Sequence, residues 1–220
     1  MKTIIVAPHP DDEILGCAGT LLRRRAEGGQ IAWIIVTSIT VEAGWSPVMV
    51  ENRHSEIEKI SVLMGFDKVY CLNFPSAGLD QIRLSDLVCG ISKAFSEYLP
   101  DEVLIPHGED VHTDHQIVSK AVMSCTKWFR YPSIKRVMAY ETLSETDINI
   151  SGSKPLYPNF FINIENYLDA KLEALNIYSS ELGEFPFPRS ARAVSALAAV
   201  RGIASGFKAA EAFELLRERS

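Results

Sequence analysis

Short runs of apolar, largely β-branched residues alternate along this chain with segments whose apolar residues recur at helical spacing. The apolar runs predict strands at residues 3–7, 31–37, 69–72 and 103–105. The periodic segments predict helices that include residues 14–22, 51–64, 85–98, 117–122 and 169–178. Strands that alternate with helices favour a mostly parallel sheet covered on both faces. We therefore expect an α/β protein with a three-layer Rossmann-like fold, formed as a single domain over residues 1–220.

The Rossmann-like pattern does not carry the signal of a dinucleotide-binding protein. No G-x-G-x-x-G motif follows the first strand, and the sequence G-C-A-G at residues 16–19 falls inside the first predicted helix. We expect these glycines to allow close packing of that helix against the sheet. The alanine-rich tail, residues 189–219, is expected to pack on the sheet or to line the edge of a pocket.

Composition fits one enzyme domain and narrows its partners. The 220 residues are 47% hydrophobic, which is enough to bury a core, and no linker divides them. The net charge of -6 argues against a nucleic-acid or anionic-membrane partner, because those partners need clustered Lys and Arg. The single run of cations, residues 23–25, is expected at the exposed end of the first helix.

The sequence shows no sign of export or membrane insertion. Its first residues lack the charged and then apolar pattern of a secretory leader, and no stretch approaches the roughly 18 apolar residues of a membrane span. The four cysteines are widely spaced and form no C-x-x-C pair, so neither disulfides nor a cysteine zinc site is expected. We therefore expect a cytoplasmic protein.

Four of the five histidines lie in two clusters that follow predicted strands. The first cluster is V-A-P-H-P-D-D-E at residues 6–13, and the second is P-H-G-E-D-V-H-T-D-H at residues 106–115. Loops at the carboxyl ends of parallel strands gather at one edge of a sheet, so both clusters are expected to form one site. Either cluster alone is as well explained by a solvated turn with helix-capping carboxylates. Two clusters together favour a metal-dependent hydrolase.

Imidazole and carboxylate groups suit zinc, and a catalytic zinc usually has three protein ligands and an open position for water. His9, Asp12 and His115 form such a set. Asp11 is then placed to remove a proton from water as general base. Asp114 can orient His112, which, held protonated, would stabilise the oxyanion formed when water attacks a carbonyl.

The same residues carry a resemblance to a known family. The chain resembles the LmbE-like, or PIG-L, family of zinc-dependent N-deacetylases, whose hallmarks are His-Pro-Asp-Asp-Glu near the N-terminus and His-x-Asp-His past the middle. The likeness extends through G-C-A-G-T at 16–20, N-R-H-S-E-I-E at 52–58 and the stretch 158–182. The resemblance implies the same roles as the chemistry does. It implies Zn²⁺ on His9, Asp12 and His115, with Asp11 as base and His112 with Asp114 as the oxyanion pair.

Substrate contacts are expected from three further residues, Trp45, Arg53 and Asp110. Trp45 lies in the loop after the second strand and suits either a sugar-stacking platform or a packing anchor. Arg53 matches an arginine of the family and suits hydroxyl or phosphate oxygens, with a surface ion pair as the alternative. Where the family often has Gln, this chain has Glu181, and if that segment lines the substrate pocket its carboxylate would favour a basic or hydroxyl-rich ligand over an anionic one.

The expected reaction, as the resemblance implies, is removal of the N-acetyl group from a small amino sugar or sugar conjugate. Two alternatives stay open. The same zinc site could cleave an ester or another amide, and a metal-stabilised sugar-binding module would need the ligands but not Asp11 or His112. Relatives often associate, so a homo-oligomer also stays open, and the identity of the substrate depends on loop shapes that the sequence does not reveal.

Overall fold

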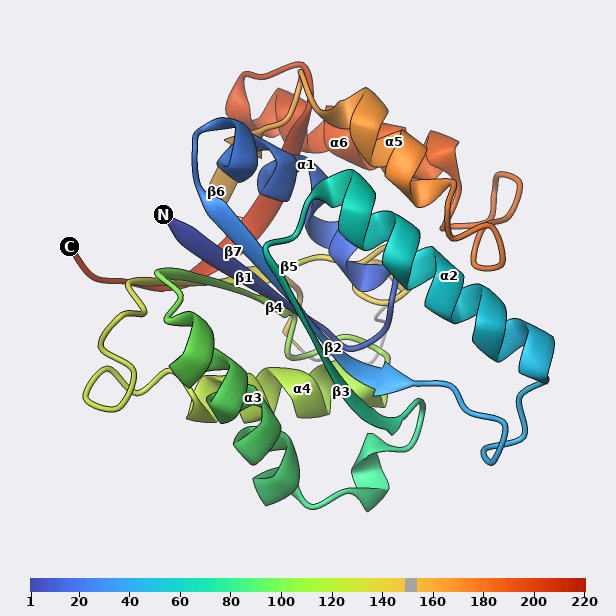
Figure 1. Cartoon of the computed structure of the whole chain (residues 1–220). Coiled ribbons are helices and arrows are strands. Elements are labelled where there is room, and N and C mark those ends of the chain that lie inside the picture. Colours follow the sequence, from blue (N-terminus) through green and yellow to red (C-terminus); the bar gives the residue numbers. More distant parts are fainter. Residues whose placement is uncertain (149–153) are drawn as a thin grey trace.

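The computed structural model describes residues 1–148 and 154–220 and contains one seven-stranded sheet in the order β3-β2-β1-β4-β5-β7-β6 (Figure 1). The strands are β1 (Lys2–Ala7), β2 (Gln30–Ser38), β3 (Lys68–Pro75), β4 (Glu102–Pro106), β5 (Arg136–Tyr140), β6 (Phe160–Asn163) and β7 (Ala210–Glu218). The first five strands pair in parallel, and β7 runs antiparallel to both β5 and β6. The predicted mostly parallel sheet is confirmed.

Helices cover both faces of this sheet, which confirms the predicted three layers (Figure 1). The helices are α1 (Asp12–Ala26), α2 (Pro47–Met64), α3 (Leu84–Tyr98), α4 (Thr113–Ser124), α5 (Leu168–Leu175) and α6 (Ala191–Ser205), with a short 3₁₀ turn, η1 (Leu79–Gln81). Apolar residues of α1, α2, α5 and α6 share one core cluster, and those of α3 and α4 share the other.

Alternation along the strands divides the core between the two faces. In β1, Ile5 and Ala7 face the cluster under α1, whereas Ile4 and Val6 face the cluster under α3 and α4. All four side chains are fully buried. A strand that is apolar at every position is what a sheet covered on both faces requires. The carboxyl ends of β1 and β4 are thereby fixed side by side, and both histidine clusters follow them.

Glycines in α1 bring this helix onto the sheet as the sequence predicted. A Cβ added at Gly16 would lie 2.4 Å from Cδ2 of Tyr140, and one added at Gly19 would lie 2.6 Å from Cγ2 of Ile164. No side chain larger than hydrogen fits at these contacts. Close approach of α1 matters for the site, because its first turn supplies two of the residues discussed below.

The alanine-rich tail forms a helix and then a strand. Its first half forms α6, which packs against the sheet, but its second half enters the sheet as β7 between β5 and β6. β5 was also not foreseen, and α2 begins earlier than predicted because Ser46 caps it and Pro47 starts it. The prediction that the arginines at residues 23–25 lie exposed at the end of the first helix is only partly correct. Arg24 is buried and donates to the Glu102 carboxylate at 2.9 Å.

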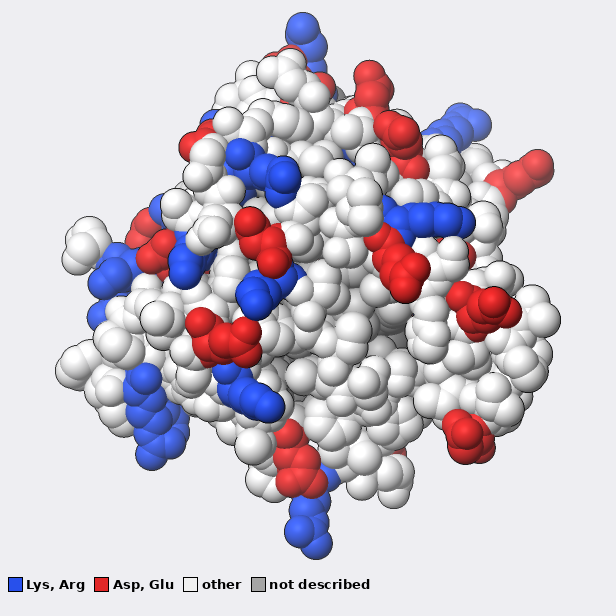
Figure 2. Space-filling view, in the orientation of Figure 1, with Lys and Arg blue, Asp and Glu red and all other residues white. Residues whose placement is uncertain are grey.

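The segment 144–158 is rich in Ser, Asn, Gly and Pro, which predicts a loop, and its residues 149–153 lie outside the described residues. In the described part of the chain, no helix combines the length and apolar character needed to cross a bilayer. Figure 2 shows basic and acidic side chains interspersed over the face that is viewed, without a broad patch of one sign.

Candidate active site

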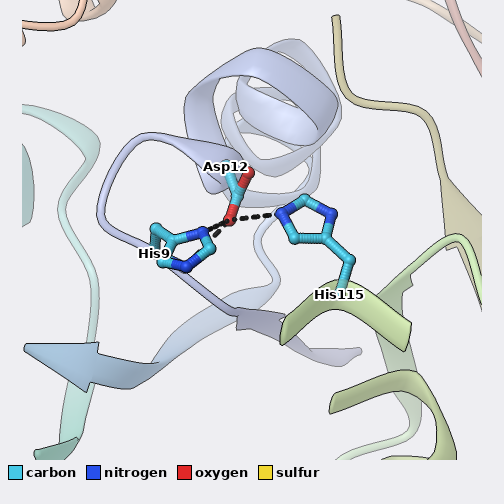
Figure 3. Close-up of side chains that lie close together, drawn as sticks. All are labelled: His9, Asp12 and His115. Carbon is cyan, nitrogen blue, oxygen red and sulfur yellow. Dashed lines mark hydrogen bonds and ion pairs between the residues drawn. The ribbon is translucent and has the colours of Figure 1, made fainter. Parts of the chain in front are cut away.

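The two histidine clusters meet at one edge of the sheet. His9 follows β1, Asp12 begins α1, and His115 lies in the first turn of α4. The Asp12 Oδ2 atom lies 3.4 Å from His9 Nδ1 and 3.3 Å from His115 Nε2, as Figure 3 shows. The candidate ligand atoms of the three side chains all lie within 4.8 Å of one another. The structure therefore assembles in one place the metal ligands that the sequence suggested.

The charges around these side chains favour a bound cation. Burial by itself lowers the pKa of His115, but the Asp12 and Asp110 carboxylates raise it to about 10. Burial also lowers the pKa of His9, yet hydrogen bonds with Asp114 and Asp12 raise it to about 9. Burial raises the pKa of Asp12, but His115 and His9 hold it well below its usual range. The carboxylates thus stabilise positive charge here, whether it is carried by protons or by a metal ion.

Asp110 supports His115 rather than facing a substrate. Its Oδ2 atom lies 2.8 Å from His115 Nδ1, and its Oδ1 accepts a hydrogen bond from Thr146 Oγ1 at 2.7 Å. The Asp110 side chain is fully buried behind the histidine. The predicted substrate contact of Asp110 is therefore wrong, because no surface of this residue is open to a ligand. A carboxylate on the second nitrogen of a ligand histidine fixes the ring orientation and increases its basicity.

Asp114 also has a different partner from the one predicted. Its carboxylate lies 3.0 Å from His9 Nε2 and accepts the backbone N–H groups of Ala77 and Leu79. His112 instead caps α4, and its Nδ1 accepts the backbone N–H of Asp114 at 3.1 Å. His112, His9 and Asp114 form a second group whose candidate ligand atoms lie within 4.8 Å of one another.

His112 is neutral in this arrangement. A ring nitrogen that accepts a hydrogen bond carries no proton, so the proton of the neutral ring lies on Nε2. Burial and the neighbouring His9 and His115 lower the pKa of His112 to about 4. The expectation of a protonated His112 is therefore corrected. The Nε2–H group can still donate a hydrogen bond to a developing oxyanion.

Asp11 lies in a strained turn at the start of α1. Its φ of 139° is a conformation that residues other than glycine rarely adopt, and the Glu13 carboxylate accepts its backbone N–H at 3.0 Å. Burial and the nearby Asp12 raise the pKa of Asp11 to about 7, while Arg189 acts in the opposite direction. A carboxyl group with a pKa near neutrality can both accept and return a proton.

Glu13 and Tyr178 support the turn at Asp11 through a chain of hydrogen bonds. The Tyr178 hydroxyl donates to Glu13 Oε1 at 2.7 Å, and both side chains are buried. Sequence reasoning included Glu13 in the first cluster but gave it no role. Its place two residues beyond Asp11 was the available signal, but its partner Tyr178 lies in the segment that follows α5.

A cavity of about 270 Å³ opens beside these residues. Two of the predicted substrate contacts, Trp45 and Arg53, line it, and Trp45 is 40% exposed. Its acid–base and candidate metal-binding lining consists of His9, Asp11, Asp12, His112 and His115. Other polar and charged lining residues include Ser76, Glu56, Glu145, Ser180, Glu181 and Arg189.

Arg189 and Glu145 were missed from the sequence. Arg189 Nη1 donates to Asp11 Oδ2 at 3.0 Å, and Arg189 Nη2 lies 3.4 Å from Glu145 Oε1. Arg189 follows a stretch rich in Pro and Phe and has no periodic or motif signal. Only the folding of the segments after β5 and α5 brings these side chains to the cavity.

Comparison with the sequence models of known families decides which family the chain belongs to. The sequence model of GlcNAc-PI de-N-acetylase, PIG-L, matches residues 4–126, which is more than half of the chain. The chain belongs to the PIG-L family. The matched residues include most of β1, the first turn of α1 and the whole second cluster, so every candidate metal ligand falls inside the match.

Relatives of this PIG-L protein are deacetylases. It is 27% identical over 183 residues to YaiS, an uncharacterized deacetylase of Escherichia coli, and the alignment covers 80% of this chain and 90% of that protein. It is 25% identical over 193 residues to the diacetylchitobiose deacetylase of Thermococcus kodakarensis, with 83% of this chain and 71% of the relative covered.

A solved structure shares the whole fold of the chain. The conserved protein TT1542 from Thermus thermophilus superposes with a TM-score of 0.78 at 27% identity, and the match covers 99% of this chain and 96% of that one. The strands and helices that position the candidate site, including the strand β7 that the sequence did not reveal, thus lie within one shared PIG-L architecture.

Proposed function

We propose that this PIG-L protein is a zinc-dependent hydrolase that removes the acetyl group from an N-acetylated amino sugar or sugar conjugate. The products would be acetate and a free amine. The observation that carries the proposal is the convergence of His9, Asp12 and His115 beside the buried carboxyl group of Asp11, on one wall of the cavity. The deacetylases related to this chain, one of which is named for diacetylchitobiose, support the substrate class.

The residues at this place fit a zinc ion. Two imidazoles and one carboxylate are ligands that zinc accepts, and three protein ligands are usual for a catalytic zinc. Carboxylates on the far nitrogens of both histidines provide the outer support typical of such sites. When bound, zinc would act as a Lewis acid for the acetyl carbonyl and would bring the pKa of water to roughly 7.

Asp11 is the residue that moves the proton. Its carboxylate accepts a proton from water as the water oxygen bonds to the acetyl carbon. The tetrahedral intermediate then loses the amine as the C–N bond breaks, and Asp11 returns the proton to the leaving nitrogen. The raised pKa of Asp11, about 7, suits both transfers because neither protonation state is strongly favoured near neutral pH.

His112 stabilises the charge that develops on the carbonyl oxygen. The Nδ1 atom is held by the Asp114 backbone N–H, so Nε2–H is the group left to donate toward the cavity. A preorganised donor of this kind stabilises an oxyanion without needing to reorganise during the reaction. The neutral ring serves as well as a protonated one, because the donated hydrogen is the same.

The test is metal content together with product release. We expect near-stoichiometric zinc in the purified protein, and acetate and free amine from N,N'-diacetylchitobiose or another N-acetylated sugar, with loss of turnover on chelation. Asp11→Asn should abolish turnover while zinc stays bound, whereas the exposed Asp169→Asn should behave as the wild type. Ester cleavage without amine release would favour the esterase alternative. Sugar binding that survives without turnover of any substrate would favour the binding module.

A further inference from the structure

Arg53, which α2 presents to the cavity, has a protein partner at each nitrogen of its guanidinium group. Nη1 donates to the Pro10 carbonyl at 2.7 Å, and Nη2 donates to Glu181 Oε1 and, at 3.5 Å, to Ser180 Oγ. Nε lies 3.1 Å from Glu56 Oε2. The side chain is 13% exposed. Arg53 therefore lines the cavity as expected, but its charge is already neutralised within the protein.

Arg189, the other arginine of the cavity wall, is engaged in the same way. Its Nε donates to Ser144 Oγ at 2.9 Å, and its Nη2 lies 3.4 Å from Glu145 Oε1. Its Nη1 donates to Asp11 Oδ2 at 3.0 Å and to Glu181 Oε2 at 3.1 Å. Glu181 thus lies between the two arginines, with one carboxylate oxygen on each.

Charge in this part of the cavity is dominated by carboxyl groups. Four of them surround the two guanidinium groups. They belong to Asp11, Glu56, Glu145 and Glu181. Among the described residues that line the cavity, no Lys or Arg is left without a carboxylate partner. An anionic group of a substrate would have to displace one of these carboxylates before it could bind an arginine.

A second observation indicates what the wall can accept. Glu56 is 7% exposed and lines the cavity, yet its Oε2 makes no hydrogen bond with any described residue. The nearby Nε of Arg53 gives it an ion-pair contact but not a hydrogen bond. Because Oε2 is itself buried, Glu56 adds negative charge to this wall rather than an open acceptor, and that charge favours a neutral or cationic ligand over an anionic one.

We propose that the cavity selects uncharged or cationic N-acetylated sugars over anionic conjugates, and that Glu181 sets this selectivity by holding Arg53 and Arg189. This inference rests on the proposed function and names the substrate class of the same site. Glu181 acts as a positioning residue, since it works through the two arginines. Its loss as a charge would leave Arg53 Nη2 without a carboxylate partner and so available to a phosphate or carboxylate.

The experiment compares three substrates that differ in the charge of the group beyond the sugar. They are N,N'-diacetylchitobiose, the 2-aminoethyl glycoside of N-acetylglucosamine, and N-acetylglucosamine 1-phosphate. We expect the zinc-loaded wild type to have at least about a tenfold higher kcat/KM for the first two than for the phosphate. Glu181→Gln should shift the ratio of phosphate to neutral substrate by about tenfold, through KM for the phosphate. A general loss of activity lowers kcat/KM for both substrates by the same factor, so it leaves this ratio unchanged.

Matched variants and a binding measurement separate the outcomes. Glu184→Gln makes the same change at an exposed position of the same loop and should leave the ratio unchanged. Glu56→Gln should lower kcat/KM for the aminoethyl glycoside relative to the neutral sugar. A wild type that prefers the phosphate, or a ratio unmoved in Glu181→Gln, would overturn the proposal.

If none of the three substrates is deacetylated, the proposed function fails, and calorimetry still tests the charge selectivity. N-acetylglucosamine should then bind the zinc-loaded protein more tightly than its 1-phosphate does. Tighter binding of the phosphate would overturn the inference on its own.

Discussion

Arg189 Nη1 lies 3.0 Å from Asp11 Oδ2, although the two residues are 178 positions apart in the chain. Burial raises the pKa of Asp11 and Asp12 raises it further, to about 7, while Arg189 is the main group that lowers it. The arginine therefore keeps a buried carboxyl group from becoming fully protonated near neutral pH. A proposed general base would depend on a residue at the other end of the sequence.

Replacement of Arg189 should consequently move the pH profile. Asp11 must be ionised to accept a proton, so kcat/KM falls as the pH drops through its pKa. Arg189→Met removes the cation, raises the pKa of Asp11 and should shift the acidic limb of the profile to higher pH. The measurement is kcat/KM against pH for the zinc-loaded enzymes. Arg192→Met, at an exposed position on α6, is the matched control. An acidic limb at the wild-type pH in Arg189→Met would contradict the role of the ion pair.

Asp110 should contribute to metal affinity rather than to substrate binding. Its Oδ2 lies 2.8 Å from His115 Nδ1 in a fully buried contact. Loss of such an outer carboxylate usually lowers metal affinity by about 10- to 100-fold. We expect Asp110→Asn to release zinc to a competing chelator at correspondingly lower chelator concentration, with KM unchanged at saturating zinc. Asp80→Asn, on the exposed η1 turn, should retain wild-type affinity. A raised KM with unaltered metal affinity would restore the substrate role.

Much of the fold, and the three candidate metal ligands, could be predicted because their sequence signals are local. His9 and Asp12 are three residues apart at a strand end, and His115 follows a second strand in the same way. Apolar runs marked β1, β2 and β4, since strands buried on both faces are mostly apolar, and a shorter run at 69–72 marked the partly exposed edge strand β3. β7 was hidden because its sequence, AEAFELLRE, is rich in residues of low strand propensity. Pairing with β5 and β6 overrides that preference.

The polar contacts behind the metal set could not be predicted, because they depend on tertiary packing. Asp114 was paired with His112 from sequence proximity, but the backbone N–H groups of Ala77 and Leu79 hold its carboxylate beside His9. The contact of Arg189 with Asp11 spans nearly the whole chain. Neither contact leaves a periodic or motif signal in the sequence. Residue types and motifs therefore indicate which residues form the site, but not which side chains contact one another.

Glu13 should stabilise the strained turn at Asp11. Its carboxylate accepts the Asp11 N–H at 3.0 Å and the Tyr178 hydroxyl at 2.7 Å, so Glu13→Ala leaves two buried donors without a partner. We expect a loss of about 3 kcal/mol in the free energy of unfolding and a lower kcat, with zinc content preserved. Tyr178→Phe keeps the bond to Asp11 and should cost about 1 kcal/mol while kcat stays near that of the wild type. Urea unfolding and steady-state kinetics measure both. An unaltered kcat in Glu13→Ala would show that the turn needs no such support.

Gly16 should not tolerate even a methyl group. An added Cβ would lie 2.4 Å from the ring of Tyr140, a buried side chain that cannot move aside. Alanine gains about 1 kcal/mol in helix propensity, but overpacking of this kind costs more, so Gly16→Ala should lower the free energy of unfolding by about 2 kcal/mol. At Gly90 the nearest atom is 3.2 Å away and belongs to the flexible end of Leu72. Gly90→Ala should therefore be neutral or stabilising by up to about 1 kcal/mol. The same sign for both variants in urea unfolding would refute the packing argument.

A buried ion pair joins α5 to β7, and both of its side chains also hydrogen-bond to the backbone of α1. Lys171 Nζ lies 2.6 Å from Glu211 Oε1 and donates to the Leu15 carbonyl, while the Glu211 carboxylate accepts the N–H groups of Gly19 and Thr20. Both charged side chains are 4% exposed. The pair therefore fixes the helix that carries Asp12 to the strand at the centre of the C-terminal half of the sheet.

Removing one charge of this pair should lower the free energy of unfolding far more than removing both charges together. Lys171→Met leaves the Glu211 charge buried without its cation, and we expect a loss of about 3 kcal/mol in the free energy of unfolding. Lys171→Met combined with Glu211→Gln removes both charges, so the double variant should lose less than the sum of the two single changes. The exposed pair of Lys208 and Glu165, 3.6 Å apart, is the control, and Lys208→Met should change stability by no more than about 0.5 kcal/mol. Urea unfolding of the wild type, Lys171→Met, Glu211→Gln and the double variant gives the coupling energy directly. Additive losses would mean that the two charges stabilise the fold independently, through their separate bonds to the backbone of α1.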